Sequence, residues 1–209
     1  MAHYFDPNPD GPSERKTVSA RFHGIDFVFT TDSDVFSRQH VDFGTNLLVR
    51  TVIEDFVKAG IPGDGSLLDL GCGYGVIGIA MKRVFPALHV TMADINARAV
   101  ELATENAKTN HTPYVRILTS DGWNGIEGSF STVITNPPVR AGKKTIFSFY
   151  DGAYNRITPG GKLYVVLQKK QGAPSSEAYL RELFGNCEMI ARDAGYWILR
   201  SVRTPESDS

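Results

Sequence analysis

A short apolar run followed by closely spaced glycines constrains this chain more than any other stretch. The run Ser66–Leu70 stops at Gly71, Gly73 and Gly75, and apolar residues then recur at helical spacing over residues 76–80. This order predicts a buried strand, a tight turn and a helix. Glycine reaches positive φ without strain and lets a ligand approach the backbone closely, and the first amides of the helix point into the same space. The turn therefore predicts a ligand-binding loop.

Asp69, directly before the glycines, narrows the choice of ligand. Residues 73–78 also fit the dinucleotide pattern G-x-G-x-x-G, which is weak evidence by itself. A carboxylate at the end of the strand would repel a pyrophosphate, but it suits a ligand that carries an ammonium and a sulfonium group. The pattern Asp-x-Gly-x-Gly-x-Gly resembles the S-adenosylmethionine (SAM) loop of the Rossmann-like methyltransferases.

Strands alternate with helices along the rest of the chain, which predicts an α/β fold with a doubly wound, mostly parallel seven-stranded sheet. We expect an N-terminal hairpin at 18–22 and 25–30 and a C-terminal antiparallel hairpin at 188–191 and 196–202. The other expected strands are 89–93, 114–119, 131–135 and 162–167, and the expected helices are 43–59, 96–110, 144–156 and 177–184. Asn96 and Ser175-Ser176 are expected helix caps, and residues 159–161 an expected turn.

We expect residues 15–203 to form a single methyltransferase domain, between a flexible lead-in at 1–14 and a flexible tail at 204–209. No apolar run approaches the ~20 residues of a membrane span, and residues 1–6 lack the order of a signal peptide. The two cysteines form no C-x-x-C pair and the five histidines are scattered, so neither a disulfide framework nor a metal site follows. We expect a cytoplasmic protein without a membrane or metal partner; its oligomeric state is left open.

The net charge of −1 argues against a generally basic nucleic-acid-binding protein. However, all 22 Lys and Arg residues lie within residues 15–203, whereas five of the 23 acidic residues lie outside, so the body of the chain is net positive. A local basic patch therefore remains open.

Acidic residues follow two of the expected strands, at the edge where doubly wound sheets bind ligands. Asp94 comes 19 positions after Gly75, which matches the acid that accepts hydrogen bonds from a ribose hydroxyl. Asp121 follows the third strand, where the adenine amino group is usually recognised in this superfamily. A helix-capping role for Asp94 and a plain turn at Asp121-Gly122 are the alternatives.

Asn136-Pro137-Pro138 follows the fourth strand and is the second specific signal. Two prolines hold the backbone extended and remove two donors, which leaves carbonyls free of a regular ladder. A planar amino group would donate one hydrogen to the Asn136 side-chain oxygen and one to a nearby carbonyl, that of Pro137. These contacts favour the positively charged tetrahedral nitrogen that forms as it attacks a methyl group.

Several blocks together resemble the methyltransferase small domain family, which forms the catalytic half of small-subunit rRNA guanine-N2 methyltransferases and also occurs as a single domain. The blocks lie at 34–37, 42–48, 68–75, 136–143 and 168–174, and the resemblance covers about residues 18–203. It implies a SAM cofactor bound by Asp69, Gly71, Cys72, Gly73, Gly75, Asp94, Ile95, Asp121, Gly122 and Asn136. It also implies that Asn136, Pro137 and Pro138 form the catalytic loop, and that Phe36, Phe43, Gly44 and Thr45 lie over the mouth of the site.

The resemblance implies ribosomal RNA or the small ribosomal subunit as the partner. Val139 departs from the aromatic residue that many amino-methyltransferases place after the prolines, so base stacking would pass to Phe36 or another aromatic. Basic residues flank the expected site and are candidates for phosphate binding: Arg38, Arg140, Lys143, Lys144, Lys169 and Lys170. A solvated charged edge is the alternative for these residues.

Three other functions are weighed against methylation of an RNA-base amine. Methylation of a protein amide or of DNA adenine uses the same Asn-Pro-Pro loop, but Val139 disfavours both. An NAD-dependent oxidoreductase has no use for Asp69 or Asn136-Pro-Pro138. A non-catalytic RNA-binding or ribosome-binding protein needs no intact catalytic loop beside an intact glycine loop.

Overall fold

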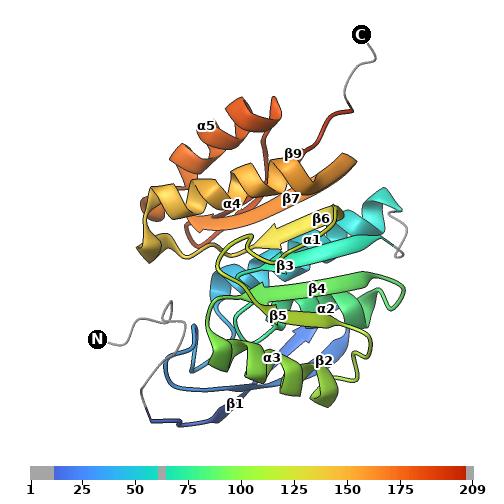
Figure 1. The fold of residues 1–209 in the computed structure, drawn as a ribbon, viewed down its shortest axis with the longest axis vertical. Helices are drawn as coiled ribbons and strands as arrows, with labels where there is room; N and C mark the ends of the chain where they lie inside the picture. The colour runs from blue at the N-terminus through green and yellow to red at the C-terminus, as the bar shows by residue number, and fades with distance from the viewer. Residues whose placement is uncertain (1–11, 61–64, 206–209) are drawn as a thin grey trace.

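The computed structural model describes residues 12–60 and 65–205. Seven strands form one sheet in the order β5-β4-β3-β6-β7-β9-β8, and a separate two-stranded sheet pairs β1 with β2. The five strands from β5 to β7 run parallel, and β9 is antiparallel to both of its neighbours, β7 and β8 (Figure 1). The strands are β1 (Lys16–Phe22), β2 (Ile25–Thr31), β3 (Ser66–Leu70), β4 (His89–Asp94), β5 (Arg116–Thr119), β6 (Phe130–Thr135), β7 (Ile157–Gln168), β8 (Glu188–Asp193) and β9 (Tyr196–Val202). The predicted fold class is confirmed.

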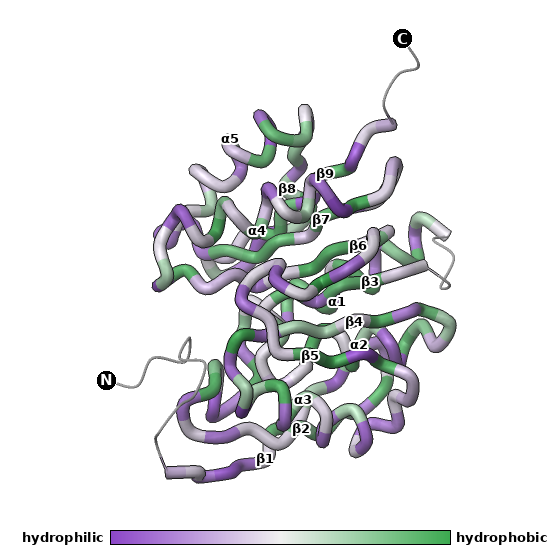
Figure 2. Tube along the Cα trace, in the orientation of Figure 1, coloured by the Kyte–Doolittle hydropathy of each residue, from purple (hydrophilic) through white to green (hydrophobic). Residues whose placement is uncertain are grey.

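Helices cover both faces of the sheet (Figure 1). The helices are α1 (Phe43–Ala59), α2 (Val76–Val84), α3 (Ala97–Thr109), α4 (Lys143–Arg156) and α5 (Ala173–Phe184), with short 3-10 turns η1 (Val139–Ala141) and η2 (Lys169–Gln171). One apolar cluster joins α1, α2, α3 and the β1-β2 hairpin to one face, and a second joins α4 and α5 to the other. Hydrophobic stretches run along the middle strands, as Figure 2 shows.

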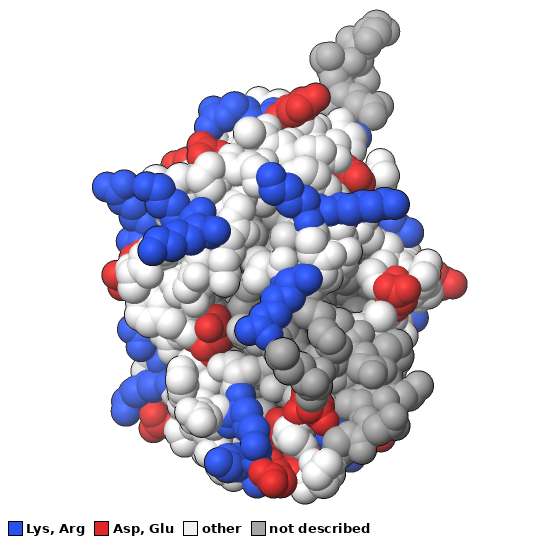
Figure 3. All heavy atoms as spheres, turned by 90° about the vertical axis from the view of Figure 1, so that its left-hand side faces the viewer, with Lys and Arg blue, Asp and Glu red and all other residues white. Residues whose placement is uncertain are grey.

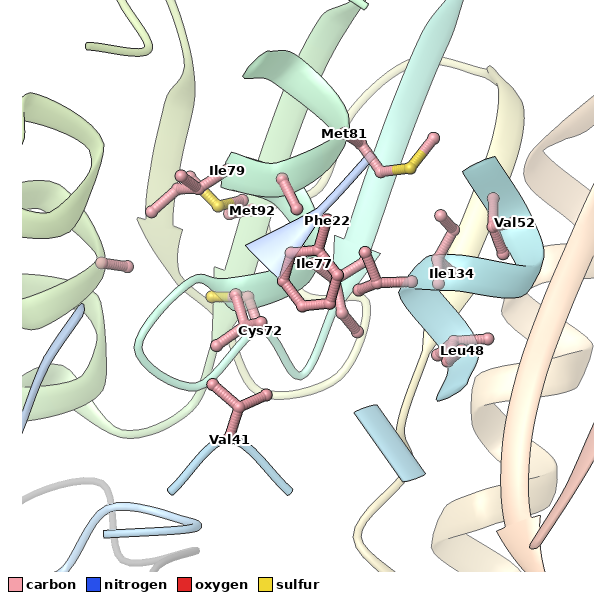
Figure 4. Packing of buried hydrophobic residues seen from close by; sticks show 14 of the residues in the cluster. Phe22, Val41, Leu48, Val52, Cys72, Ile77, Ile79, Met81, Met92 and Ile134 are labelled. Carbon is pink, nitrogen blue, oxygen red and sulfur yellow. The ribbon is translucent and has the colours of Figure 1, made fainter. Parts of the chain in front are cut away.

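The N-terminal hairpin and α1 pack on the same face of the sheet. Figure 4 shows Phe22 of β1 beside Ile77 of α2, and Leu48 and Val52 of α1 beside Ile134 of β6. All five side chains are at most 3% exposed. Burial of this size contributes about 1.5–3 kcal/mol for each large side chain. The hairpin and α1 are therefore integral to the packing of the sheet.

Asn106 of α3 and Asn110, the C-cap residue of that helix, hydrogen-bond to the backbone of β2 in the way that a neighbouring strand would. The Asn106 side chain accepts from Thr30 N at 2.7 Å and donates to Thr30 O at 2.9 Å. Asn110, one helical turn later, accepts from Val28 N at 3.1 Å and donates to Val28 O at 2.8 Å. The spacing of four residues places both amides on one face of the helix. Backbone groups of β2 are thereby satisfied, and the hairpin is tied to α3.

The predicted turn at residues 159–161 is wrong, because β7 continues through it. The pairing register with β6 shifts between Phe130 and Thr132, which marks a bulge. Gly160 N donates to Arg203 O at 2.7 Å, so the segment keeps a backbone partner. Proline and glycine here bend β7 near its start, and they do not form a separate turn between α4 and the strand.

The predicted cap at Ser175-Ser176 is also wrong. Helix α5 begins at Ala173 after Gly172, whose φ of 105° lies in the left-handed region. The Ser176 side chain is buried, where Tyr150 Oη and Ser176 Oγ lie 3.1 Å apart. The Asn96 cap of α3 is confirmed, since its side chain accepts from Ala99 N at 3.2 Å. Most of the expected lead-in and tail, residues 1–11 and 206–209, lies outside the described residues.

Candidate functional site

A cavity of about 390 Å³ opens beyond the carboxyl ends of the parallel strands. Most of the expected site residues line it: Phe36, Gly71, Cys72, Gly73, Asp94, Ile95, Asp121, Gly122, Asn136, Pro137, Pro138, Val139 and Arg140. The expected residues outside the lining are Asp69, Gly75, Arg38, Phe43, Gly44, Lys143, Lys144, Lys169 and Lys170. The topology thus gathers the strand ends of β3, β4, β5 and β6 around one hollow.

The glycine loop connects β3 to α2 through three residues at positive φ: Gly71 at 75°, Gly73 at 53° and Gly75 at 93°. A Cβ on Gly73 would meet nothing within 4 Å, whereas a Cβ on Gly75 would lie 3.3 Å from the backbone of Ala103 in α3. Cys72 N donates to Ala93 O at 3.0 Å, which holds the loop against β4. Gly73 therefore borders open space for a ligand, and Gly75 permits the close approach of two helices.

Asp94 fixes the geometry where β4 ends. Its Oδ2 accepts from Gly73 N at 2.8 Å, and its Oδ1 accepts from Asn96 N at 2.9 Å. Burial raises the pKa of the Asp94 carboxyl, while these backbone donors lower it. The Asn96 side chain also donates to Asp34 O at 3.0 Å, which ties the loop before α1 to this strand end. Asp94 is thus an oriented carboxylate on the cavity wall.

Asp69 lies behind the cavity wall, fully buried. Its Oδ2 accepts from Gly78 N in the first turn of α2 at 2.9 Å, and its Oδ1 has no hydrogen-bond partner. Burial raises the pKa of this carboxyl to about 7; the Gly78 amide lowers it and the nearby Asp94 raises it. A buried carboxylate with an unsatisfied oxygen is costly unless positive charge lies nearby. Asp69 is therefore a buried carboxyl group behind the cavity wall with one unsatisfied oxygen.

Asn136 is held by the start of α1. Its Nδ2 donates to Thr45 Oγ1 at 2.9 Å and lies 3.4 Å from Asp42 Oδ2. Asp42 is the N-cap of α1, and its Oδ2 also accepts from Thr45 N at 3.0 Å. Within residues 12–60 and 65–205, no side chain or amide donates to Asn136 Oδ1. The role of Asp42 was missed by sequence reasoning, although Asp42 and Thr45 have the spacing of a helix cap and its partner.

An aromatic wall, also missed, comes from β9. Tyr196 lines the cavity, and its ring centroid lies 5.6 Å from that of Phe43. A Cβ on Gly44 would lie 2.7 Å from two atoms of the Tyr196 ring, so only glycine permits this approach. Phe36 lies in the same lining and is 40% exposed. Tyr74 of the glycine loop and Phe149 of α4 complete the aromatic residues of the lining, so none of them comes from the loop at Val139.

Basic side chains surround the mouth unevenly. Figure 3 views the carboxyl edge of the sheet and shows Lys and Arg gathered in separate groups on it. Arg140 lines the cavity. Lys143 and Lys169 are exposed, and each follows a segment of the cavity lining in the chain. Arg38 instead forms an ion pair with Glu14 and also donates to its carbonyl oxygen. The charge of Arg38 is therefore partly neutralised by Glu14.

Neither a metal site nor a membrane span is found in the part of the chain that the structure describes. Over residues 12–60 and 65–205, His, Cys, Asp and Glu nowhere come together in a group of three or more able to hold a metal ion. In the same ranges every helix is too short or too polar to cross a bilayer.

The strand order, the glycine loop and the polar strand ends define a Rossmann-like methyltransferase fold. The chain belongs to the methyltransferase small domain family, whose profile matches residues 26–200.

Comparison with known proteins gives relatives of two lengths. The uncharacterized protein YbxB of Bacillus subtilis (strain 168) is 40% identical over 203 residues, which are 96% of this chain and 98% of that protein. The ribosomal RNA large subunit methyltransferase G of Streptomyces avermitilis is 31% identical over 179 residues, 83% of this chain and 45% of that protein.

Among solved structures, the 16S rRNA N2 methyltransferase RsmC of T. thermophilus, in complex with AdoMet and guanosine, superposes with a TM-score of 0.82. It is 26% identical and covers 92% of this chain and 51% of its own. The chain thus spans nearly the whole Bacillus protein but about half the length of these two rRNA methyltransferases.

Proposed function

We propose that this protein transfers a methyl group from SAM to an exocyclic amine of an RNA base, most specifically guanine N2 of ribosomal RNA. One observation carries the proposal: Asn136, whose amide oxygen accepts from no residue within 12–60 and 65–205, lines the same cavity as the glycine loop and Asp94. The cavity therefore has an acceptor group for an amine beside a loop suited to the methyl donor. The relatives that act on rRNA support the choice of acceptor.

The residues present fit a SAM cofactor. Asp94 and Asp121 both line the cavity. In the proposed complex Asp94 would accept from a ribose hydroxyl, and Asp121 would accept from the adenine amino group. The open space at Gly73 admits the ligand close to the backbone. The buried carboxylate of Asp69 complements a ligand with an ammonium and a sulfonium. When bound, SAM supplies an electrophilic methyl group on a sulfonium.

The catalytic loop acts by holding the acceptor amine. Asn136 Oδ1 and the carbonyl of Pro137 accept its two hydrogens, which turns the nitrogen lone pair toward the methyl group. As the nitrogen becomes tetrahedral and positive, both acceptors bind it more strongly, so they stabilise the transition state more than the ground state. Pro138 follows at φ −72° and has no N–H to compete for these oxygens. Catalysis therefore rests on positioning.

The surroundings of the loop suit a nucleic-acid base. Tyr196 and Phe36 offer rings for stacking in place of the aromatic that Val139 does not supply. Arg140 lines the cavity, and Lys143 and Lys169 are exposed. In the proposed complex these three residues would bind phosphates beside an extruded base. We accordingly propose ribosomal RNA or the small ribosomal subunit as the partner, in the cytoplasm.

Transfer of labelled methyl from SAM to a panel of acceptors tests the proposal. The panel holds naked 16S and 23S rRNA, intact small and large subunits, tRNA, DNA and a protein lysate, and the labelled product is hydrolysed for nucleoside analysis. We expect N2-methylguanosine in rRNA. Label confined to protein or to DNA adenine would replace the proposed acceptor, and SAM binding without transfer to any acceptor would indicate a non-catalytic binding protein.

A further inference from the structure

The amide of Asn136 is oriented by residues that lie more than ninety positions earlier in the chain. Its Nδ2 donates to Thr45 Oγ1 at 2.9 Å. The second partner, Asp42 Oδ2, lies 3.4 Å from Nδ2 and 3.4 Å from Thr45 Oγ1. Thr45 can accept from the amide and donate to the carboxylate at the same time, because a hydroxyl does both. The three side chains thus form a short relay that ends on a carboxylate.

This relay decides which end of the amide faces the acceptor. A carboxylate is an acceptor only, so the donating nitrogen of Asn136 is favoured beside Asp42, and the opposite orientation would place two oxygens against each other. The carbonyl oxygen is then left for the amine of the substrate. The negative charge of Asp42 also polarises the amide and makes that oxygen a stronger acceptor.

The position of the relay is set by the packing of α1. Asp42 caps the helix, and Thr45, in its first turn, is 8% exposed. Gly44 lies between these two residues in the chain, and the ring of Tyr196 packs against it. The start of α1 therefore contacts β9 through Gly44 and the catalytic loop through Thr45. A shift of this helix end would move Asn136.

We infer that Asp42 and Thr45 are positioning residues for the methyl-transfer reaction, which fix the Asn136 amide with its oxygen toward the acceptor amine. This inference rests on the proposed function. It assigns the turnover rate of the enzyme in part to the N-terminus of α1, which acts through the side-chain amide of Asn136.

The variants follow from the chemistry of the relay. Thr45→Val keeps the shape of the side chain and removes the hydroxyl, and Thr45→Ser keeps the hydroxyl. We expect Thr45→Val to lower kcat roughly tenfold or more with the Kd for SAM unchanged, and Thr45→Ser to recover most of that loss. Asp42→Asn removes the charge but still caps the helix, so it should lower kcat without unfolding α1. Thr51→Val, on the same helix and outside the site, is the matched control.

A double-mutant cycle with Asn136→Ala separates positioning from a general structural effect. If Thr45 acts through the amide, Thr45→Val causes no further loss of kcat once Asn136 is alanine. An equal fold-loss in both backgrounds would overturn the inference.

A second measurement needs no acceptor and so remains decisive if the proposed function fails. The side-chain amide of Asn136 is followed by nuclear magnetic resonance in the full chain. We expect slow hydrogen exchange in the wild type, faster exchange and a shifted resonance in Thr45→Val, and little change in Thr45→Ser. An amide resonance that Thr45→Val leaves unchanged would refute the relay, whereas absent methyl transfer with an intact relay would refute only the proposed function.

Discussion

Gly75→Ala should mainly lower the stability of the protein, whereas Gly73→Ala should mainly lower its affinity for SAM. In Gly75→Ala the new Cβ lies 2.9 Å from Ile79 Cδ1 and 3.3 Å from the Ala103 backbone, at a φ of 93°. Left-handed strain costs roughly 1–2 kcal/mol and overpacking about 1–3 kcal/mol, so the free energy of unfolding should fall by about 3 kcal/mol. In Gly73→Ala the methyl meets nothing within 4 Å and φ is 53°, so only about 1 kcal/mol is lost.

The effect on SAM should be reversed. The methyl of Gly73→Ala projects into the space where the ligand approaches the backbone, so we expect SAM affinity to fall tenfold or more, about 1.4 kcal/mol. Gly24→Ala is the matched control, because it has a φ of 78°, equally open surroundings and a place in the β1-β2 turn away from the cavity. Calorimetric titration with SAM and thermal unfolding measure the two quantities. Wild-type SAM affinity in Gly73→Ala, or equal stability of the two loop variants, would refute this division of roles.

Three further predictions follow. Asp94→Ala should weaken SAM binding about 10- to 100-fold in a titration, because a charge-assisted hydrogen bond contributes about 1.5–3 kcal/mol. SAM affinity should be about tenfold higher at pH 8 than at pH 6: the pKa of Asp69 is about 7 in the free protein, and a cationic ligand favours the charged form, so Asp69→Asn should abolish this pH dependence. Asp55→Ala should lower the free energy of unfolding by about 1–3 kcal/mol in urea titrations, because Lys162 and Arg200 both lose their shared carboxylate.

Each of these has an outcome that contradicts it. Unchanged SAM affinity in a folded Asp94→Ala protein would mean that the ribose is held elsewhere. A SAM affinity that stays the same between pH 6 and pH 8 would remove Asp69 from the binding of the cation.

The pKa of Asp55 is lowered; burial raises it, but hydrogen bonds from Tyr164, Arg200 and Lys162 outweigh that effect. Its contribution to stability is therefore present above its unfolded pKa near 4 and lost as the pH falls below it, and acid titration curves of wild type and Asp55→Ala that stay parallel would contradict this reading.

Short-range patterns were sufficient for most of the fold. The β3 strand, the glycine turn and α2 were predicted because apolar periodicity and glycine spacing are local properties. The Asn96 cap was predicted for the same reason. The segment at residues 159–161 was mistaken for a turn because a bulge depends on pairing with the neighbouring strand. Ser176 was mistaken for a cap because its hydroxyl is buried in the core beside Tyr150, which only the tertiary structure shows.

The site was predictable only as far as strand ends define it. Asp94, Asp121 and Asn136 were placed by topology, because the carboxyl ends of parallel strands meet at one edge. The contact between Asp42 and Asn136 joins residues 94 positions apart, and no local pattern encodes such a contact. The withdrawal of Asp69 behind the wall depends on the approach of α2, which the sequence does not show.

Single-turnover transfer of methyl from bound SAM, in the wild type and in Asn136→Ala, tests the central claim most directly. The acceptor is the RNA found in the panel, and the SAM affinity of both proteins is measured beside the rate. We expect SAM binding to stay nearly intact and the rate to be at least tenfold lower in Asn136→Ala, because the amine loses an acceptor that stabilises its transition state. An equal rate in the two proteins would remove Asn136 from the mechanism and contradict the claim that this cavity holds the amine for methylation.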